Sequence, residues 1–481
     1  MKEMTVIIHG WSDSSESFKQ LKNYLIKEEF GTVKTVLYAD YESREDHLKF
    51  EDIVDGLNDQ FMKQGIIDED GVKKANINVI CHSTGGLVIR HWIWRYYSSN
   101  EQCSGDIANC PVKKIVMLAP ANFGSHLAHR GKSFFSSLVK GRWKFGDFLE
   151  TGKGILEGLE LGSPYQWRLA HGDLICEKPY YNRNQVQVTI LVGIEGYGGV
   201  AKVVNKPGTD GTVIIAGTSL DSAKLRLDFS KPAPADAEQD YAPYQWAVED
   251  PQGDFAFGVL EGLDHGSVVG ESADPEKLVC QLLTEALSVK TAKEFGAFAQ
   301  KVEALTKATY VKTAKPRFQQ FLVHAVDDQG SSVNDFTLDF FIWKADEGVK
   351  GSLVTRDRLS RRELEFSEQA NQILTASFHT HTIDLSHRSF VVNLDAMKGL
   401  LADARKEFQV PIVLSMRLFV PRIDDGIQYD VRSLQNIVLY NSDKKIQGLP
   451  SFFYGNTTTL LELKVNRYNS YVTLGTEPVK H

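Results

Sequence analysis

Residues 76–86 read NINVICHSTGG, and this stretch decides the fold that the sequence predicts. Its first part, Ile77 to Ile80, is a short apolar run typical of a buried strand, and a helix-like pattern begins near Gly86. A sharp turn with Ser83 at its centre joins the two. A strand that passes directly into a helix is the repeating unit of a parallel sheet.

The same alternation continues on both sides of this stretch. Strand patterns occupy residues 4–8, 35–38, 112–118, 186–192 and 255–260, and helix patterns occupy residues 18–30, 50–64, 86–97 and 275–305. Strands that alternate with helices of about 10–15 residues indicate βαβ units. We therefore predict an α/β fold with a mostly parallel sheet and helices on both faces.

The pattern changes near residue 309, which indicates a second domain. Phe336, Leu338, Phe340 and Ile342 recur at period two, as expected for antiparallel strands, and one helix-like segment covers residues 394–408. We expect an α/β domain over residues 1–308, with a cap or lid insertion at about 122–184. Residues 309–481 are expected to form a mostly antiparallel, sandwich-like β domain.

Composition excludes several classes of protein. The net charge of −8, from 62 acidic and 54 basic residues, argues against a nucleic-acid partner. No run of about 18 apolar residues occurs, so a transmembrane segment is not expected. No signal peptide is evident, which predicts a cytoplasmic location and leaves leaderless export open. Among the five cysteines, Cys103 and Cys110 could pair in an oxidising compartment.

Ser83 stands where a nucleophile elbow requires it, between a strand and a helix. The turn would hold its hydroxyl above the sheet edge, and the helix N-terminus would face a developing oxyanion. Strand and helix approach closely at such a turn, so small residues are needed two positions either side. Gly85 and Cys81 meet this need, although the pattern is C-x-S-x-G rather than G-x-S-x-G. The alternative is a serine in an ordinary βα turn.

About 290 N-terminal residues resemble α/β-hydrolase lipases and esterases. The motifs that carry the resemblance are IIHGW, CHSTGG, LAPANFGS, DGTV and LDHGS. The third is similar to the segment that leads into the cap of bacterial lipases and of deacylases acting on glycosylphosphatidylinositol lipids. The resemblance implies a Ser-Asp-His triad, and it does not reach the C-terminal domain.

The family's acid follows the serine and precedes the histidine. Asp210 in DGTV occupies the matching loop, and Asp221, Asp228 and Asp264 are the alternative acids. Asp210 and Gly211 could also form an ordinary turn without a catalytic role. Of the 13 histidines, only His265 lies after that acid and within the α/β domain. We therefore expect Ser83, Asp210 and His265 to be catalytic.

The remaining site residues follow from the same resemblance. The oxyanion hole is expected from the backbone N–H groups of Trp11 and Thr84. Aromatic residues of the 121–184 segment either line an acyl-chain pocket under a lid or pack the insertion's own small core. The predicted substrate contacts are His82, Phe123, Phe134, Phe135 and Trp143.

A metal site is not expected. His379 and His381 have ligand-like spacing on a strand, and His387 is near, but no cysteine or carboxylate set completes a tetrahedral site. A surface strand is the better interpretation of these histidines. No cofactor is expected either.

These features predict a serine hydrolase that cleaves carboxylic esters, in particular acylglycerol-type lipid esters, through an acyl-enzyme. The expected partners are an ester or lipid substrate and, peripherally, a lipid surface. One alternative is a phospholipase or lipid deacylase, including the kind that bacteria secrete as effectors. The other is a non-catalytic binding module that uses its β domain.

Overall fold

The chain divides into two compact units, which are described separately. The computed structural model describes residues 4–9, 18–36, 48–98, 107–128, 153–176, 179–230, 245–250, 254–345, 358–420, 428–429, 434, 437–442 and 452–468. Unit 1 comprises Met1–Ser222, Pro251–Lys315 and Asn456–Thr458. Unit 2 comprises Ala223–Asp250, Pro316–Gly455 and Thr459–His481.

Unit 1 is built on a six-stranded parallel sheet. The strands are β1 (Met4–Ile8), β2 (Thr32–Val36), β3 (Ile77–His82), β4 (Val112–Leu118), β5 (Gln187–Gly193) and β8 (Ala256–Leu260). They lie in the order β2-β1-β3-β4-β5-β8, and each neighbouring pair is parallel. The predicted α/β fold with a mostly parallel sheet is confirmed.

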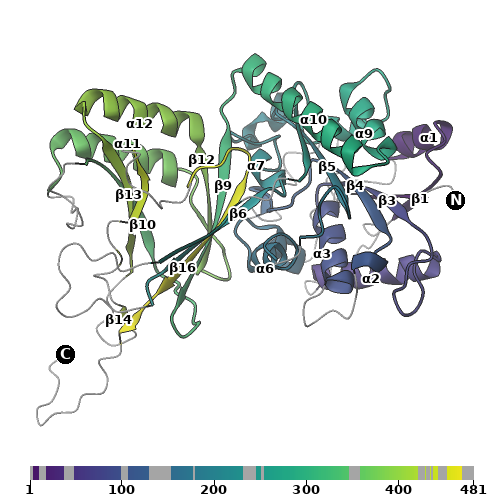
Figure 1. Ribbon diagram of the computed structural model, residues 1–481, viewed down its shortest axis with the longest axis horizontal. Helices are drawn as coiled ribbons and strands as arrows, with labels where there is room; N and C mark the ends of the chain where they lie inside the picture. The colour runs from purple at the N-terminus through teal and green to yellow at the C-terminus, as the bar shows by residue number, and fades with distance from the viewer. Residues whose placement is uncertain are drawn as a thin grey trace, which may run out of the picture. The chain divides into compact units, whose positions relative to one another are not determined.

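Helices cover both faces of this sheet (Figure 1). Three helices, α1 (Lys19–Lys27), α9 (Leu278–Ser288) and α10 (Ala292–Thr313), pack their apolar residues in one cluster with side chains of β1, β3, β4 and β5. The opposite face carries α2 (Phe50–Lys63), α3 (Gly85–Tyr97) and α6 (Pro164–Asp173). Because both faces are covered, the strands are almost continuously apolar.

Two elements differ from those expected, and a third segment is described in part. The second strand, Thr32–Val36, begins three residues earlier than expected, and residues 37 and 38 of the predicted strand lie outside the described residues. The helical stretch 275–305 divides into α9 and α10, since the Thr291 side chain accepts a hydrogen bond from the Glu294 N–H and begins a new helix. The 122–184 segment contains α5 (Lys153–Leu159) and α6, and its residues 129–152 and 177–178 lie outside the described residues.

Unit 2 combines an antiparallel three-stranded sheet and a mixed six-stranded sheet with the helices α11 (Arg361–Thr375) and α12 (Leu394–Phe408). The three-stranded sheet has the order β10 (Thr337–Lys344), β13 (Ile412–Phe419) and β15 (Ile437–Asn441). A six-stranded sheet contains, in order, β11 (His379–Thr380), β12 (His387–Asn393), β9 (Phe318–Asp327), β16 (Thr458–Val465), β6 (Ser222–Asp228) and β7 (Gln245–Glu249). Its sheets and these two helices share one apolar core.

The division between the units differs from the expected boundary at residue 308. Strands β6 and β7 precede the last strand of the hydrolase sheet in sequence, yet they belong almost entirely to unit 2. β6 pairs with β7 and with β16, and its Leu225 and Leu227 join the core of unit 2. Unit 2 is therefore built from separate chain segments.

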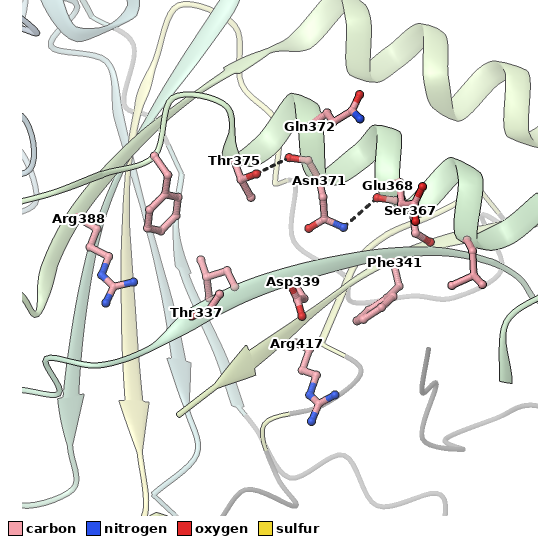
Figure 2. Close-up of a pocket in the computed structure, with 13 residues that line it drawn as sticks. Thr337, Asp339, Phe341, Ser367, Glu368, Asn371, Gln372, Thr375, Arg388 and Arg417 are labelled. Atoms are coloured by element: carbon pink, nitrogen blue, oxygen red, sulfur yellow. Dashed lines mark hydrogen bonds between the residues drawn. The ribbon is translucent and has the colours of Figure 1, made fainter. Parts of the chain in front are cut away.

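Helix α11 closes the free edge of β10 with its side chains (Figure 2). Asn371 accepts a hydrogen bond from the Phe340 N–H at 3.0 Å and donates one to the Phe340 carbonyl at 2.6 Å. One turn earlier, Ser367 accepts from the Ile342 N–H at 2.9 Å. The match is geometric, because four helical residues rise about 6 Å and two strand residues advance about 6.6 Å. An edge so covered is closed to further strand pairing.

A pocket of about 630 Å³ lies along this helix–strand contact (Figure 2). Its charged lining consists of two arginines, Arg388 and Arg417, and two carboxylates, Asp339 and Glu368. The lining therefore carries no net charge.

Candidate active site

Ser83 lies in a strained turn between β3 and α3. Its φ of 51° is in the left-handed region, which is uncommon for a residue with a side chain. The turn is held from two sides: the Ser83 N–H donates to the Leu118 carbonyl at 3.2 Å, and the Ser83 carbonyl accepts from Ala121 at 2.9 Å. Such strain persists only where the surroundings over-determine it, and it is a feature of functional sites.

The two glycines after the turn are required by the close approach of β3, α3 and the loop beyond β4. A Cβ on Gly85 would lie 2.7 Å from the Ile8 carbonyl oxygen and 3.3 Å from the Cβ of Cys81. On Gly86 it would lie 2.8 Å from the Cβ of Pro120. A cysteine therefore fits two positions before Ser83, while the position two after it has no room for a side chain.

Ser83, His265 and Asp210 come together although they are far apart in sequence. The His265 Nε2 lies 3.2 Å from the Ser83 Oγ, and its Nδ1 lies 2.9 Å from the Asp210 Oδ2. Ser83 is 7% exposed, His265 6% and Asp210 0%. An imidazole held between a hydroxyl and a buried carboxylate can take the hydroxyl proton while the carboxylate stabilises the resulting charge.

The loop around Asp210 fixes both oxygens of its carboxylate. Oδ1 accepts hydrogen bonds from the N–H groups of Thr212 at 3.0 Å and Val213 at 2.8 Å, which leaves Oδ2 directed at His265. The Asp210 carbonyl also accepts from the His265 N–H at 3.0 Å. Of the alternative acids, Asp264 instead accepts hydrogen bonds from the N–H groups of Gly266 at 3.1 Å and Ser267 at 2.8 Å, where the short helix α8 (Ser267–Gly270) begins.

Comparisons with known proteins bear on the family and the fold of the chain. Residues 2–143, which include Ser83, match the model of the family Lipase (class 2). Phospholipase PlaB from Legionella pneumophila has a similar structure, with a TM-score of 0.76 and 19% identity over 100% of this chain and 97% of that chain. The chain is a lipase- and esterase-like α/β-hydrolase. The expected resemblance is confirmed, and the chain is classed as a carboxylic ester hydrolase.

Two further structural likenesses were found. The same Legionella phospholipase in complex with thio-NAD gives a TM-score of 0.73 at 20% identity, covering 99% of this chain and 97% of that chain. Lipase BlEst2 from Bacillus licheniformis in its mature form gives 0.36 at 13% identity, covering 60% of this chain and 93% of that one. No curated protein matches the hydrolase by sequence.

The predicted oxyanion hole is described in part. Thr84 is buried and stands at the N-cap of α3, directly after Ser83, where the helix N-terminus favours negative charge. Trp11 lies outside the described residues. The participation of both N–H groups therefore remains a prediction.

The predicted substrate contacts fall in two groups. His82 is buried beside His265: its Nε2 lies 3.1 Å from the His265 carbonyl, and the two rings are 4.7 Å apart. Phe123 is fully buried, with the Arg90 guanidinium over its ring at 5.5 Å. Substrate contact by these two remains a prediction, while Phe134, Phe135 and Trp143 lie outside the described residues.

A buried ion pair supports the loop that follows β4, and sequence reasoning missed it. Arg90 on α3 and Asp173 on α6 are both 0% exposed and form two hydrogen bonds, of 2.7 and 2.9 Å. Arg90 also donates to the Asn122 carbonyl at 2.9 Å. The charged Asp173 raises the pKa of Arg90 against the opposing effect of burial. Helix α3, which begins two residues after Ser83, thereby fixes the loop after β4.

A second missed residue is Gly193, at the end of β5. A Cβ there would lie 2.0 Å from the Leu263 carbonyl oxygen, in the loop that carries His265. The neighbouring Glu195 N–H donates to that same carbonyl at 2.9 Å. A glycine that ends a strand opposite the base-bearing loop is the sequence signal that could have indicated this contact.

Two histidines of unit 2 form a ring pair. His387 stacks on His324, its partner across β12 and β9, with ring centroids 3.9 Å apart. Burial, with the nearby His324 as a second cause, lowers the pKa of His387 to about 4. Within the described part of the chain no group of three potential ligands could hold a metal ion, and no helix is long and apolar enough to cross a membrane.

Proposed function

We propose that the hydrolase cleaves ester bonds of lipids through a Ser83-His265-Asp210 triad and an acyl-enzyme. The observation that carries the proposal is the chain of two contacts, 3.2 Å from Ser83 Oγ to His265 Nε2 and 2.9 Å from His265 Nδ1 to Asp210 Oδ2. These are the distances that a nucleophile and its general base need for proton transfer.

The reaction begins when His265 Nε2 takes the proton of the Ser83 hydroxyl as the oxygen attacks the ester carbonyl. Asp210 keeps the Nδ1–H of His265 in place and stabilises the imidazolium. The carbonyl oxygen becomes an oxyanion, which the N–H groups of Thr84 and Trp11 hold beside the N-terminus of α3. His265 then gives its proton to the departing alcohol, leaving the acyl group on Ser83.

Water completes the cycle. His265 takes a proton from a water molecule as that water attacks the acyl-enzyme, and returns the proton to Ser83 as the carboxylic acid leaves. One ester and one water are consumed, and one acid and one alcohol are formed. His82 contributes as a positioning residue, because its contact with the His265 carbonyl restrains the loop that carries the base.

Among lipid esters, phospholipids are the favoured substrate class, ahead of acylglycerols. The structural likeness to a phospholipase extends over both units, with 100% of this chain covered. The likenesses to simpler lipases and esterases have TM-scores of 0.36 or less and support no choice of substrate. Deacylation of other lipids is the second candidate.

A substrate panel tests the proposal. The parent chain, S83A and S98A are assayed on dihexanoyl-phosphatidylcholine, tributyrin and p-nitrophenyl esters of two to twelve carbons. Ser98 is a matched control at the other end of α3, because its buried hydroxyl has no hydrogen-bond partner among the residues that the structure describes. We expect S83A to lose at least a thousandfold in rate and S98A to keep parent activity.

The panel also separates the substrates. Faster turnover of the phosphatidylcholine than of tributyrin supports the phospholipase form of the proposal. A preference for acetate over longer acyl chains would contradict lipid specificity. Full activity in S83A would contradict the mechanism itself.

A further inference from the structure

A groove of about 710 Å³ lies in unit 2 along one side of α12, and none of the residues assigned to catalysis lines it. One wall is α12 itself. The remaining lining comes from Arg317, before β9, Tyr440 on β15, and Phe453. The volume is in the range of sites that bind small molecules.

The rim of the groove is cationic. Lys398, Arg405 and Lys406 of α12 line it, and all three are exposed. None of them forms an ion pair with another residue in the described ranges. The carboxylate that lines the groove, Asp395, is already engaged by Arg317, accepting from its N–H at 2.9 Å and from its guanidinium at 3.1 Å. Four cations and one carboxylate line the groove, so its lining carries a net charge of +3 in a chain whose net charge is −8.

The floor of the groove is apolar. Met397 and Leu401, which are 1% and 8% exposed, present the edge of the unit 2 core to it, and Leu394, Tyr440 and Phe453 pack partly buried beside them. The exposed Ala402 extends this apolar surface between the cations. A cationic rim over an apolar floor complements a molecule with an anionic head and a hydrocarbon body.

We propose that this α12 groove binds an anionic phospholipid of a bilayer, with the phosphate on Lys398, Arg405 and Lys406 and the start of an acyl chain on Met397 and Leu401. A nucleic acid matches the groove less well, because its phosphate backbone binds cations but has no hydrocarbon part to cover the apolar floor. The choice of a lipid rather than an acidic peptide rests on the proposed lipid-hydrolase function. The groove thus gives the second unit the task of holding the hydrolase at a membrane that carries negative charge.

The test measures membrane binding without turnover. Full-length S83A is floated with vesicles of phosphatidylcholine alone or with 30 mol% phosphatidylglycerol, and its partition coefficient is determined. The variant K398Q/R405Q/K406Q is compared with K293Q/K301Q/K307Q, all in the S83A chain. The control changes the charge equally at exposed lysines of α10, two of which form only exposed ion pairs.

Each cation near a membrane surface contributes roughly fivefold to binding, so the groove variant is expected to lose on the order of 100-fold on the anionic vesicles. The control is expected to bind as S83A does. A402E, which places a carboxylate over the apolar floor, is expected to reduce binding at least tenfold. Equal flotation of the groove and control variants would overturn the proposal, as would the failure of S83A to bind anionic vesicles.

Two further arms separate the possible outcomes. In the first, binding of soluble polyglutamate is measured. If polyglutamate binds through the groove cations while the chain does not float with vesicles, the ligand of the groove is an acidic protein and the lipid proposal is overturned. Hydrolysis of monomeric p-nitrophenyl butyrate is measured for each groove variant with Ser83 intact, and parent rates are expected. Loss of the proposed hydrolase activity thus registers in that assay, and loss of the proposed lipid site registers in flotation.

Discussion

Replacing Asp210 by Asn tests the part of the triad that is least evident from sequence. The Asp210 Oδ1 accepts two backbone hydrogen bonds, from Thr212 and Val213, and Oδ2 accepts one from His265. In D210N the amide oxygen must keep accepting from the N–H groups of Thr212 and Val213. If the amide turned over, its NH₂ group would face these two N–H groups, and donors cannot bond to donors. The amide NH₂ then faces His265 Nδ1.

That arrangement reverses the roles of the imidazole. Nδ1 has to accept from the amide, so the proton moves to Nε2, which can no longer take the proton of Ser83. Loss of the correct tautomer costs about 10⁴ in kcat in a triad of this kind, or roughly 5.5 kcal/mol of transition-state stabilisation. The native fold should persist, since the backbone hydrogen bonds of the loop are kept.

The assay is steady-state hydrolysis of p-nitrophenyl butyrate, with thermal unfolding to verify folding. D221N is the matched control: Asp221 is an alternative acid by chain order, while the structure directs Asp210 at the histidine. We expect D210N to lose about 10⁴ in kcat and D221N less than twofold. A loss below tenfold in folded D210N, or an equal loss in D221N, would refute the assignment of the acid.

Three other predictions follow from the same structure. G193A is expected to lower kcat/KM at least tenfold, because its Cβ would displace the Leu263 carbonyl and the loop that carries the base; parent kinetics would contradict this contact. R90M should reduce the free energy of unfolding in urea by about 3–5 kcal/mol by leaving Asp173 charged and buried, and R90M/D173L should recover most of that loss. The pKa of His387 is about 4 in the folded chain and about 6.5 in the unfolded chain, so the unfolded chain binds the proton first as the pH falls. This difference costs no stability above pH 6.5, and it lowers the free energy of unfolding progressively as the pH falls towards 4. Between pH 7 and 4.5, H387F should therefore lose about 2 kcal/mol less stability than the parent does in urea titrations, whereas equal losses would exclude this histidine as a cause.

Much of unit 1 could be predicted from periodicity. Buried parallel strands are apolar runs and the helices between them are amphipathic, so each strand of the sheet left a local signal. Ser83 was found because strand, turn and helix adjoin in sequence. His265 followed from chain order once the serine and acid were assumed.

The assembly of unit 2 could not be predicted in the same way. β6 alternates Ala223, Leu225 and Leu227, a plain strand pattern, but its partners β7 and β16 are fixed by long-range pairing that no local pattern encodes. Helix α11 did leave a signal that was missed: Ser360 and Glu363 form a capping box of the S-x-x-E type.

Tertiary contacts within unit 1 could not be predicted from the sequence either. The Arg90–Asp173 pair joins residues 83 positions apart, and nothing in either neighbourhood indicates the other. Gly193 is an ordinary strand-ending glycine until the loop with His265 is placed against it. Such residues support the site without touching the reacting groups, so motif reasoning does not reach them.

Covalent labelling with a fluorophosphonate, followed by peptide mapping, shows whether Ser83 is the nucleophile. We expect a single adduct, on the peptide that contains Ser83, absent in S83A and formed at least a hundredfold more slowly in H265A. Ester hydrolysis that persists with Ser83 unlabelled, or an adduct on a different serine, would contradict this assignment.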